Sequence, residues 1–344
     1  MQKKTNKRAQ YLFATFLCLL LVATCVRGVI ADAPMDAAPF LLDGNFNVDI
    51  TINENDGADS HEYWYQISIP ADGYTEFNIM SYCGDSVSFK LMNSDLSKNY
   101  FDGCGYYVSG GSETSPKTAT AGKALSPGTY YLGIVAPKSG RFRIKGTFKD
   151  YKTNDAGADS YDAPFDYKLG TSITGAITVT DEVDWYKVKI TSKSKYPLSV
   201  KTYTDSTYVE IYNDDLSNRV ASLSVGGGSL EAPKAEYTVP ELSKGTYYIK
   251  VTSGLGKYVM KFSKAGKCKL NATIKRKKKS VTIKTNKSAY ITARYAGESR
   301  SAYASSDNGK ATIYFYKKLK KGKKIKITVT HNDYTTTTKT YKIK

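Results

Sequence analysis

Histidine is nearly absent from this chain: 344 residues contain only His61 and His331. Zinc sites built on imidazole need ligands that lie close together, and these two residues fall in different predicted modules. His61-Glu62 begins like a metalloprotease helix, but Tyr65 stands where the second histidine would be. The sequence also lacks a Gly-x-Ser-x-Gly elbow and a glycine-rich phosphate loop that leads into a helix. We therefore expect no catalytic residues and no enzymatic activity.

Long apolar runs are equally scarce, and the one candidate lies near the start. Tyr11 to Val26 is apolar, follows the basic residues of positions 3–8 and precedes Ala31, a small residue suited to cleavage. This pattern predicts a signal peptide over residues 1–31, and hence a secreted or cell-surface protein. An uncleaved membrane anchor is the alternative. We expect no transmembrane segment after cleavage.

Cysteine is sparse, with five residues in all, and Cys18 and Cys25 lie within the predicted signal peptide. Outside the cytosol, Cys83 and Cys104 would be free to form a disulfide, because they flank a predicted hairpin. Two reduced, buried thiols are the alternative, since geometry decides between them. If Cys83 and Cys104 form the disulfide, Cys268 would be a free thiol.

Charge is unevenly distributed. Residues 267–344 carry 22 Lys/Arg and 3 Asp/Glu, whereas residues 32–266 carry 23 basic and 29 acidic residues. The net charge of +18 is therefore a property of one terminal module, and the body of the chain is mildly acidic. Such a distribution bears on binding partners rather than on the fold.

The remaining sequence indicates an all-β protein that contains an internal repeat. Tyr, Thr, Val and Ile dominate, and they alternate with polar residues between turn signals, as in Trp185–Ile190. Trp64–Ile69 matches Trp185–Ile190, and Ala124–Leu132 matches Glu241–Ile249. Matched blocks in one order predict two whole domains in tandem rather than a solenoid.

These blocks resemble the bacterial pre-peptidase C-terminal domain and the collagen-binding modules of clostridial collagenases. The resemblance rests on Asp184-Trp185-Tyr186, on Val209–Asn213 and on Leu242–Val251. It is weaker in the first copy, where Tyr63 replaces the aspartate. It implies two jelly-roll-like β-sandwiches, over residues 32–149 and 150–266.

The same resemblance implies a calcium site in the second module. In the relatives, a linker rich in Asn and acidic residues folds against an Asp-x-x-Asp pair. Asp181 and Asp184 match that pair, and Asn154 and Asp155 resemble the end of the linker, with Asp159 close by. Calcium prefers such oxygen ligands on flexible loops. The alternative is that these residues are solvated turn residues and strand caps.

Tyrosine is abundant, with 29 residues. Tyr203, Tyr208 and Tyr212 would form a ligand platform if they were exposed, because tyrosine gives rigid amphipathic contact area. The alternative is that they are core residues or cross-strand pairs.

Residues 267–344 resemble a bacterial immunoglobulin-like domain, on the basis of the stretch Leu319–Thr330. Lys275, Arg276, Lys277, Lys278 and Lys279 form its most basic run. Predicted export disfavours nucleic acid, so we expect contacts to an anionic cell-wall polymer, an acidic polysaccharide or lipid head groups. A solvated lysine-rich surface that opposes edge-to-edge aggregation is the alternative.

Together these features predict a non-catalytic binding or adhesion protein that contacts glycan, extracellular protein or cell-envelope polymer. An accessory targeting subunit of a secreted protease or glycosidase is the alternative. Calcium is the one cofactor expected.

Overall fold

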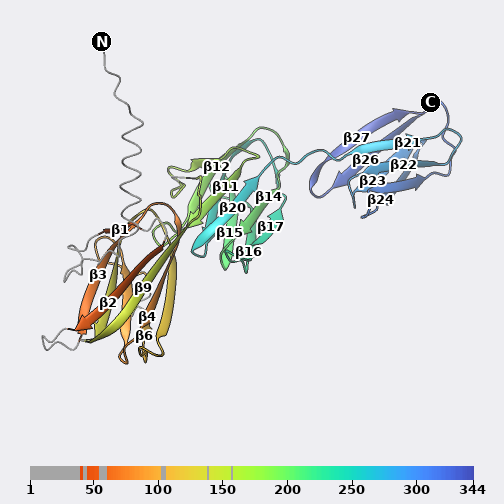
Figure 1. Ribbon diagram of the computed structural model, residues 1–344. Helices are drawn as coiled ribbons and strands as arrows, with labels where there is room; N and C mark the ends of the chain where they lie inside the picture. The colour runs from red at the N-terminus through yellow and green to blue at the C-terminus, as the bar shows by residue number, and fades with distance from the viewer. Residues whose placement is uncertain (1–38, 42–44, 54–59, 102–105, 138, 156–157) are drawn as a thin grey trace, which may run out of the picture. The chain divides into compact units, whose positions relative to one another are not determined.

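The computed structural model describes residues 39–41, 45–53, 60–101, 106–137, 139–155 and 158–344. Every regular element in these ranges is a β-strand, which confirms the predicted all-β class (Figure 1). None of the described segments is a helix of the length and apolarity needed to cross a bilayer. The predicted signal peptide, residues 1–31, lies outside the described residues. The chain divides into two compact units: Met1–Lys152 with Thr178–Asp181, and Thr153–Ile177 with Glu182–Lys344.

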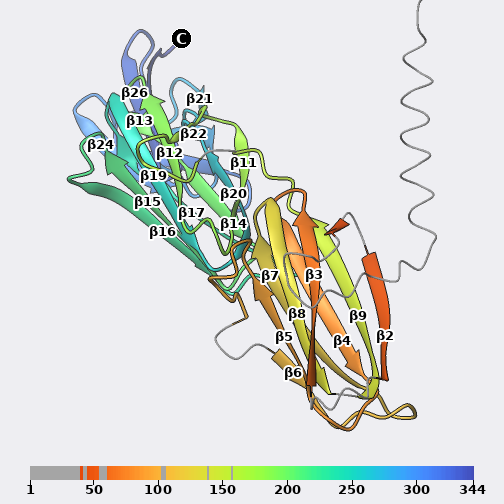
Figure 2. The ribbon, with the colours of Figure 1, turned by 90° about the vertical axis from the view of Figure 1, so that its left-hand side faces the viewer.

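The first unit is built from two sheets (Figure 2). The five-stranded sheet has the order β1(Pro39–Leu41), β3(Ser60–Ile69), β8(Gly128–Pro137), β5(Val87–Met92), β6(Tyr106–Val108). The four-stranded sheet has the order β2(Asn45–Asn53), β9(Ser139–Asp150), β4(Gly73–Ser81), β7(Lys117–Leu125). Buried and half-buried residues alternate along the whole of β4, which follows from the two-residue period of a strand. Tyr65 and Ile67 from one sheet and Phe77 and Ile79 from the other are all buried in one core.

The second unit begins with two sheets of the same strand order. Its five-stranded sheet has the order β10(Phe165–Asp166), β12(Asp184–Ile190), β19(Gly245–Ser253), β15(Ser206–Asn213), β16(Arg219–Gly226). Its four-stranded sheet has the order β11(Ser172–Ile177), β20(Gly256–Phe262), β14(Leu198–Thr202), β17(Lys234–Thr238). A short pair, β13(Ser194–Lys195) and β18(Glu241–Leu242), completes this sandwich. The only parallel pairings in either sandwich, among the residues described, join β1 to β3 and β10 to β12.

A matching turn follows β5 and β15. Asn93 Oδ1 accepts the Lys98 N–H at 3.0 Å, and Asn213 Oδ1 accepts the Asn218 N–H at 3.0 Å. Asparagine and aspartate favour such turns because their side chains bond to the nearby backbone. The same asparagine turn therefore occurs at matching positions in the two sandwiches.

The terminal sandwich has its own core and two further sheets. One has the order β21(Leu270–Ile274), β22(Ser280–Thr285), β25(Lys310–Tyr314). The other has the order β24(Glu298–Tyr303), β23(Tyr290–Tyr295), β26(Lys324–His331), β27(Tyr334–Lys342). Ile283 and Ile327, from the two sheets, are fully buried between them.

Candidate functional site

A buried network of tyrosines and carboxylates lies in the second sandwich. The hydroxyl groups of Tyr186 and Tyr258 are 2.5 Å apart. Tyr186 donates to Asp155 Oδ2 at 2.5 Å, and Tyr258 donates to Asp184 Oδ2 at 2.6 Å. Burial, the largest cause, and the nearby carboxylates raise the pKa of both tyrosines well above the usual value, so both hydroxyls remain donors at neutral pH. The network ties the segment before the sandwich to its core.

A glycine makes this approach feasible. A Cβ atom on Gly175, in β11, would collide with Asp155 Oδ2 and with the Tyr258 hydroxyl. Only glycine leaves this space open, so residue 175 must be glycine for the Asp155 carboxylate to lie where it does.

Three of the five predicted metal ligands lie together. One carboxylate oxygen each from Asp159, Asp181 and Asp184 lies within 4.8 Å of the others. Asp184 is buried, whereas Asp159 is exposed. Like charges at this separation repel, so the arrangement favours a bound cation. Hard carboxylate oxygens of this kind suit Ca²⁺.

The other two predicted ligands have different roles. Asn154 Oδ1 accepts the Thr174 N–H at 2.7 Å, and Asp155 belongs to the tyrosine network. Both therefore hold the linker against β11 and the core, beside the aspartate cluster.

Among the described residues, the matching strand of the first sandwich differs at these positions. In the matched Trp-Tyr blocks, Tyr63 and Tyr65 stand where the second sandwich has Asp184 and Tyr186. Tyr63 is buried and packs against Phe142, with ring centroids 6.1 Å apart. The duplicated strand therefore carries an aromatic contact where the second copy carries a carboxylate.

A cluster of half-exposed rings covers the outer face of the five-stranded sheet of the second sandwich. We call it the aromatic face; it consists of Tyr161, Trp185, Tyr212 and Tyr248. The Tyr161 ring centroid lies 5.5 Å from that of Trp185 and 4.8 Å from that of Tyr248, and Trp185 lies 6.4 Å from Tyr212. The rings therefore form one continuous surface.

Two lysines border the aromatic face. Lys250 Nζ lies 5.6 Å from the Trp185 ring centroid, and Lys187 Nζ lies 6.0 Å from that of Tyr248. Both lysines are direct cross-strand partners of the aromatic residues, Lys250 of Trp185 and Lys187 of Tyr248. The register of β12 and β19 thus places cations over the rings.

The corresponding tryptophan of the first sandwich is covered. Trp64 is only 4% exposed, and it packs with Tyr131, Met92 and Leu96. The matched strands therefore carry a partly exposed tryptophan in the second sandwich and a buried one in the first.

The predicted tyrosine platform is divided between two places. Tyr208 and Tyr212 lie four residues apart on β15, and the Tyr208 hydroxyl accepts a hydrogen bond from Arg219 at 2.9 Å. Tyr203 follows β14, in the other sheet, where Lys201 and Lys257 lie 5.2 and 5.4 Å from its ring centroid.

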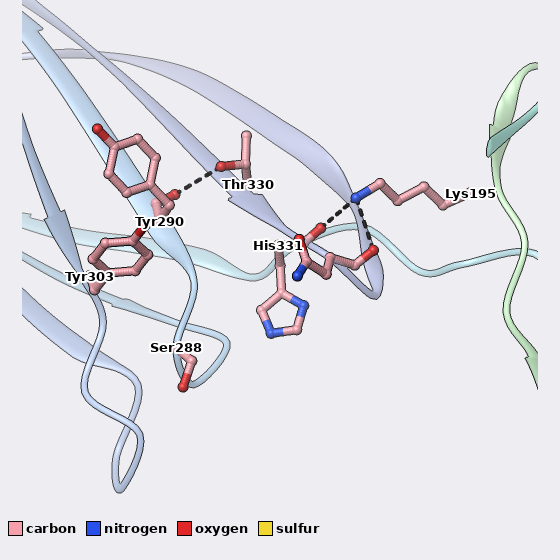
Figure 3. A pocket seen from close by; sticks show the side chains of 7 residues that line it. Lys195, Ser288, Tyr290, Tyr303, Thr330 and His331 are labelled. Atoms are coloured by element: carbon pink, nitrogen blue, oxygen red, sulfur yellow. Dashed lines mark hydrogen bonds between the residues drawn. The ribbon is translucent and has the colours of Figure 1, made fainter. Parts of the chain in front are cut away.

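A second pair of aromatic rings lies on the terminal sandwich (Figure 3). Tyr290 and Tyr303 are cross-strand partners on β23 and β24, with ring centroids 5.0 Å apart. Tyr303 is 72% exposed. Ser288 and His331 lie around the same shallow depression.

The cysteines and histidines form no nucleophile–base pair among the described residues. Cys268 is buried, and burial raises the pKa of its thiol, which opposes formation of a reactive thiolate. Cys83 Sγ lies 3.1 Å from Ser81 Oγ. Cys104 lies outside the described residues, so the Cys83–Cys104 disulfide stays a prediction. His331 Nδ1 accepts the Asp333 N–H at 3.0 Å, which fits a turn contact.

The predicted basic run forms the turn between β21 and β22. Lys275, Arg276, Lys277, Lys278 and Lys279 are all exposed there.

No family model matches the chain, and no curated protein matches it. Solved structures that share features with it include a protease, at 13% identity and a TM-score of 0.21, over 25% of this chain and 22% of the protease. The pre-peptidase C-terminal domain of a collagenase from Bacillus anthracis is 22% identical, with a TM-score of 0.22, over 28% of this chain and 90% of that domain. The adhesin domain of Epf from Streptococcus pyogenes is 12% identical, with a TM-score of 0.23, over 50% of this chain and 76% of that domain. These TM-scores are low, so the fold is defined by the strand order and pairing given above.

No pattern in the sequence groups Tyr161, Trp185 and Tyr248, which come from separate segments. The alternation of residues along β12 and β19 does predict that Trp185 and Tyr248 each point to the outer face of the sheet.

Proposed function

We propose that this chain is an exported, non-catalytic binding protein that contacts glycan or extracellular protein through the aromatic face of its second sandwich. The observation that carries the proposal is the half-exposed set of rings around Trp185, bordered by Lys187 and Lys250. Tryptophan and tyrosine combine a large apolar area with few rotatable bonds, so they bind at low entropic cost.

The contrast with the first sandwich supports this interpretation. Trp64 is buried under Met92 and Leu96, as expected for a residue that serves packing alone. Trp185 occupies the matching position and is partly exposed, so its ring is less completely covered than that of Trp64. Export is supported by the basic and apolar pattern of residues 1–31.

We further propose that Ca²⁺ binds at Asp159, Asp181 and Asp184. The gathering of three carboxylates within 4.8 Å supports it. Bound Ca²⁺ would neutralise these charges and link the segment around Asp159 to the start of β12. Asn154 and Asp155 would hold the same segment in place through Thr174 and Tyr186.

The test is binding of the whole protein to a panel of purified polysaccharides and fibrous extracellular proteins. The double variant W185A/Y248A should lose at least about tenfold in affinity for the ligand that is found, because central aromatic residues carry much of the binding energy. Tyr237→Ala is the matched control, since Tyr237 is 59% exposed on β17, in the other sheet. Equal binding by the double variant and the wild type would refute the aromatic face as the binding surface.

A further inference from the structure

Two loops that are far apart in the sequence are joined at one end of the terminal sandwich. The Lys277 N–H donates to the Leu319 carbonyl, and the Leu319 N–H donates to the Lys278 carbonyl, both at 2.9 Å. The Phe315 N–H donates to the Lys279 carbonyl at 2.7 Å. The turn after β21 and the loop after β25 are thus bonded along their backbones.

The segment after β27 joins the same end. The Gly322 N–H donates to the Ile343 carbonyl at 2.8 Å, and the Ile343 N–H donates to the Lys323 carbonyl at 2.9 Å. Leu319, Phe315 and Ile343 are each at most 3% exposed, so the loop after β25 and the segment after β27 are anchored in the core, and the turn after β21 is bonded to that loop. Their side chains are therefore presented on a fixed backbone.

The joined segments carry a dense set of exposed cations. We call this surface the basic end; it comprises Lys275, Arg276, Lys277, Lys278, Lys279, Lys317, Lys318, Lys320, Lys321, Lys323, Lys324 and Lys342. The ion pairs found among the described residues include none of these side chains. Apart from the electrostatic interaction of Lys317 with Glu298, the charge of the basic end is therefore not neutralised within the sandwich.

The one acidic residue at this end is already engaged. Glu298 accepts the N–H groups of Tyr316 and Lys317, at 2.8 and 3.0 Å, and lies 3.8 Å from Arg300. Desolvation raises the pKa of this carboxyl, but the two backbone hydrogen bonds and the nearby cations together outweigh it, so the pKa is lowered and Glu298 remains an anion at neutral pH. Its role is to fix the loop rather than to repel an anionic ligand. Asp307 and Asp333 lie in the turns at the opposite end.

We propose that the basic end binds a linear polymer whose charges are phosphodiesters spaced along a flexible chain. Lysine ammonium groups bind phosphate as compact point charges and need no fixed bidentate geometry, which suits a mobile chain. Eleven of the twelve cations of this surface are lysines. This site lies beyond the proposed function, because it occupies a different sandwich from the aromatic face and takes a different class of ligand.

The exposed apolar groups at the basic end favour a polymer over a lipid bilayer. Tyr314 and Tyr316 are 70% and 75% exposed, whereas Leu319 and Phe315 are buried. Interfacial membrane binding needs apolar side chains that enter the acyl region, and the described residues of the basic end present none beyond these tyrosines.

A polymer without bases is also favoured over nucleic acid. Single-stranded nucleic acid binds best where successive bases stack on several open aromatic rings. At the basic end, Arg300 lies 4.0 Å from the ring centroid of Tyr316 and covers one of its faces. Among the described residues at this end, the exposed rings are therefore few: Tyr314, which is 70% exposed, and Tyr316, which is partly covered by Arg300.

The test is a titration of the whole protein with soluble poly(glycerol phosphate) at several salt concentrations. The quadruple variant K277Q/K278Q/K321Q/K323Q should bind at least about thirtyfold more weakly at about 0.1 M salt, and its salt slope should fall by about three, because each phosphate contact contributes about 0.7 to that slope. The control variant K269Q/K284Q/K287Q/K310Q removes the same charge from exposed lysines at and near the other end of the sandwich. It should bind within about threefold of the wild type.

Several results would overturn the proposal. They are no binding by the wild type at low salt, an equal loss in both quadruple variants, and equal or tighter binding of a single-stranded DNA oligonucleotide or of phosphatidylglycerol vesicles. Circular dichroism melts of each variant establish that the sandwiches are folded. W185A/Y248A should bind poly(glycerol phosphate) like the wild type, so a failure of the aromatic face and a failure of the basic end are distinguishable.

Discussion

Tyr186 and Tyr258 meet hydroxyl to hydroxyl in the second sandwich, and each also donates to a buried aspartate. Four side chains thus link the segment before the sandwich, the start of β12 and the middle of β20. Buried polar groups are costly unless they are hydrogen bonded, so the network contributes to stability only while each member keeps its partner.

Tyr258→Phe should therefore lower the free energy of unfolding by about 1–3 kcal/mol, because Asp184 loses a buried donor and Tyr186 loses its neighbour. Urea denaturation followed by far-ultraviolet circular dichroism measures this change. Tyr237→Phe removes an exposed hydroxyl and should change stability by less than about 0.5 kcal/mol. A Tyr258→Phe protein as stable as the wild type would show that the network contributes nothing.

Alkaline pH should destabilise the first sandwich through Tyr65. Burial raises the pKa of this phenol far above its usual value, with a smaller contribution from Tyr63. Above pH about 10 the unfolded chain loses this proton while the folded chain keeps it. Stability is therefore intact below pH about 10 and falls as pH rises further, by up to about 1.4 kcal/mol per pH unit for this residue.

Tyr65→Phe provides the measurement. Its unfolding free energy, determined from pH about 9 to about 11.5, should fall less steeply than that of the wild type, because the variant has no phenol to ionise at this position. Identical slopes in the two proteins would contradict the claim that burial raises the pKa of Tyr65 in the folded protein.

Calcium should stabilise the second sandwich. At a roughly tenfold excess over the dissociation constant the gain is about 1.4 kcal/mol, and for an extracellular site that constant is about 10⁻⁴–10⁻³ M. Thermal melting with about 5 mM calcium, roughly five times the upper value, and with chelator measures the shift. D181N/D184N should abolish it, whereas Asp214→Asn, in an exposed turn, should retain it. A wild-type melting temperature that is the same in both buffers would contradict calcium binding at this site.

Cys268 should resist modification in the folded protein. Its side chain is 3% exposed, and burial raises the pKa of its thiol. A maleimide should label it at least about a hundredfold more slowly in buffer than in urea, because only opening of the terminal sandwich exposes the thiolate. Mass spectrometry of tryptic peptides follows the label, and rapid labelling in buffer would contradict the burial.

The alternation of buried and exposed side chains along a strand could be predicted from the sequence, because it depends only on residues of that strand. Tyr186, Val188 and Ile190 are buried, and Lys187 and Lys189 are exposed, as their alternation indicates. The turns that begin at Asn93 and Asn213 are local in the same sense, because each asparagine side chain bonds to the backbone five residues further on. These features depend on residues a few positions apart.

The surfaces could be predicted less completely, because they combine residues from distant segments. The run of five basic residues at 275–279 is visible in the sequence, but its union with the loop after β25 depends on the fold. Tyr203 is separated from Tyr208 and Tyr212 because it follows a strand of the other sheet. The resemblance to collagen-binding modules implied roles for Asp181 and Asp184, whereas the observed role of Asp155 depends on Tyr186, 31 residues away.

We propose two separate binding surfaces, one apolar and one electrostatic. The most direct measurement is retention of the wild type, W185A/Y248A and K277Q/K278Q/K321Q/K323Q on isolated cell walls from about 0.05 to about 1 M salt, a range over which screening becomes nearly complete. The lysine variant should lose the part of retention that salt removes from the wild type, and the aromatic variant the part that survives high salt. Retention curves that coincide for all three proteins would contradict both surfaces.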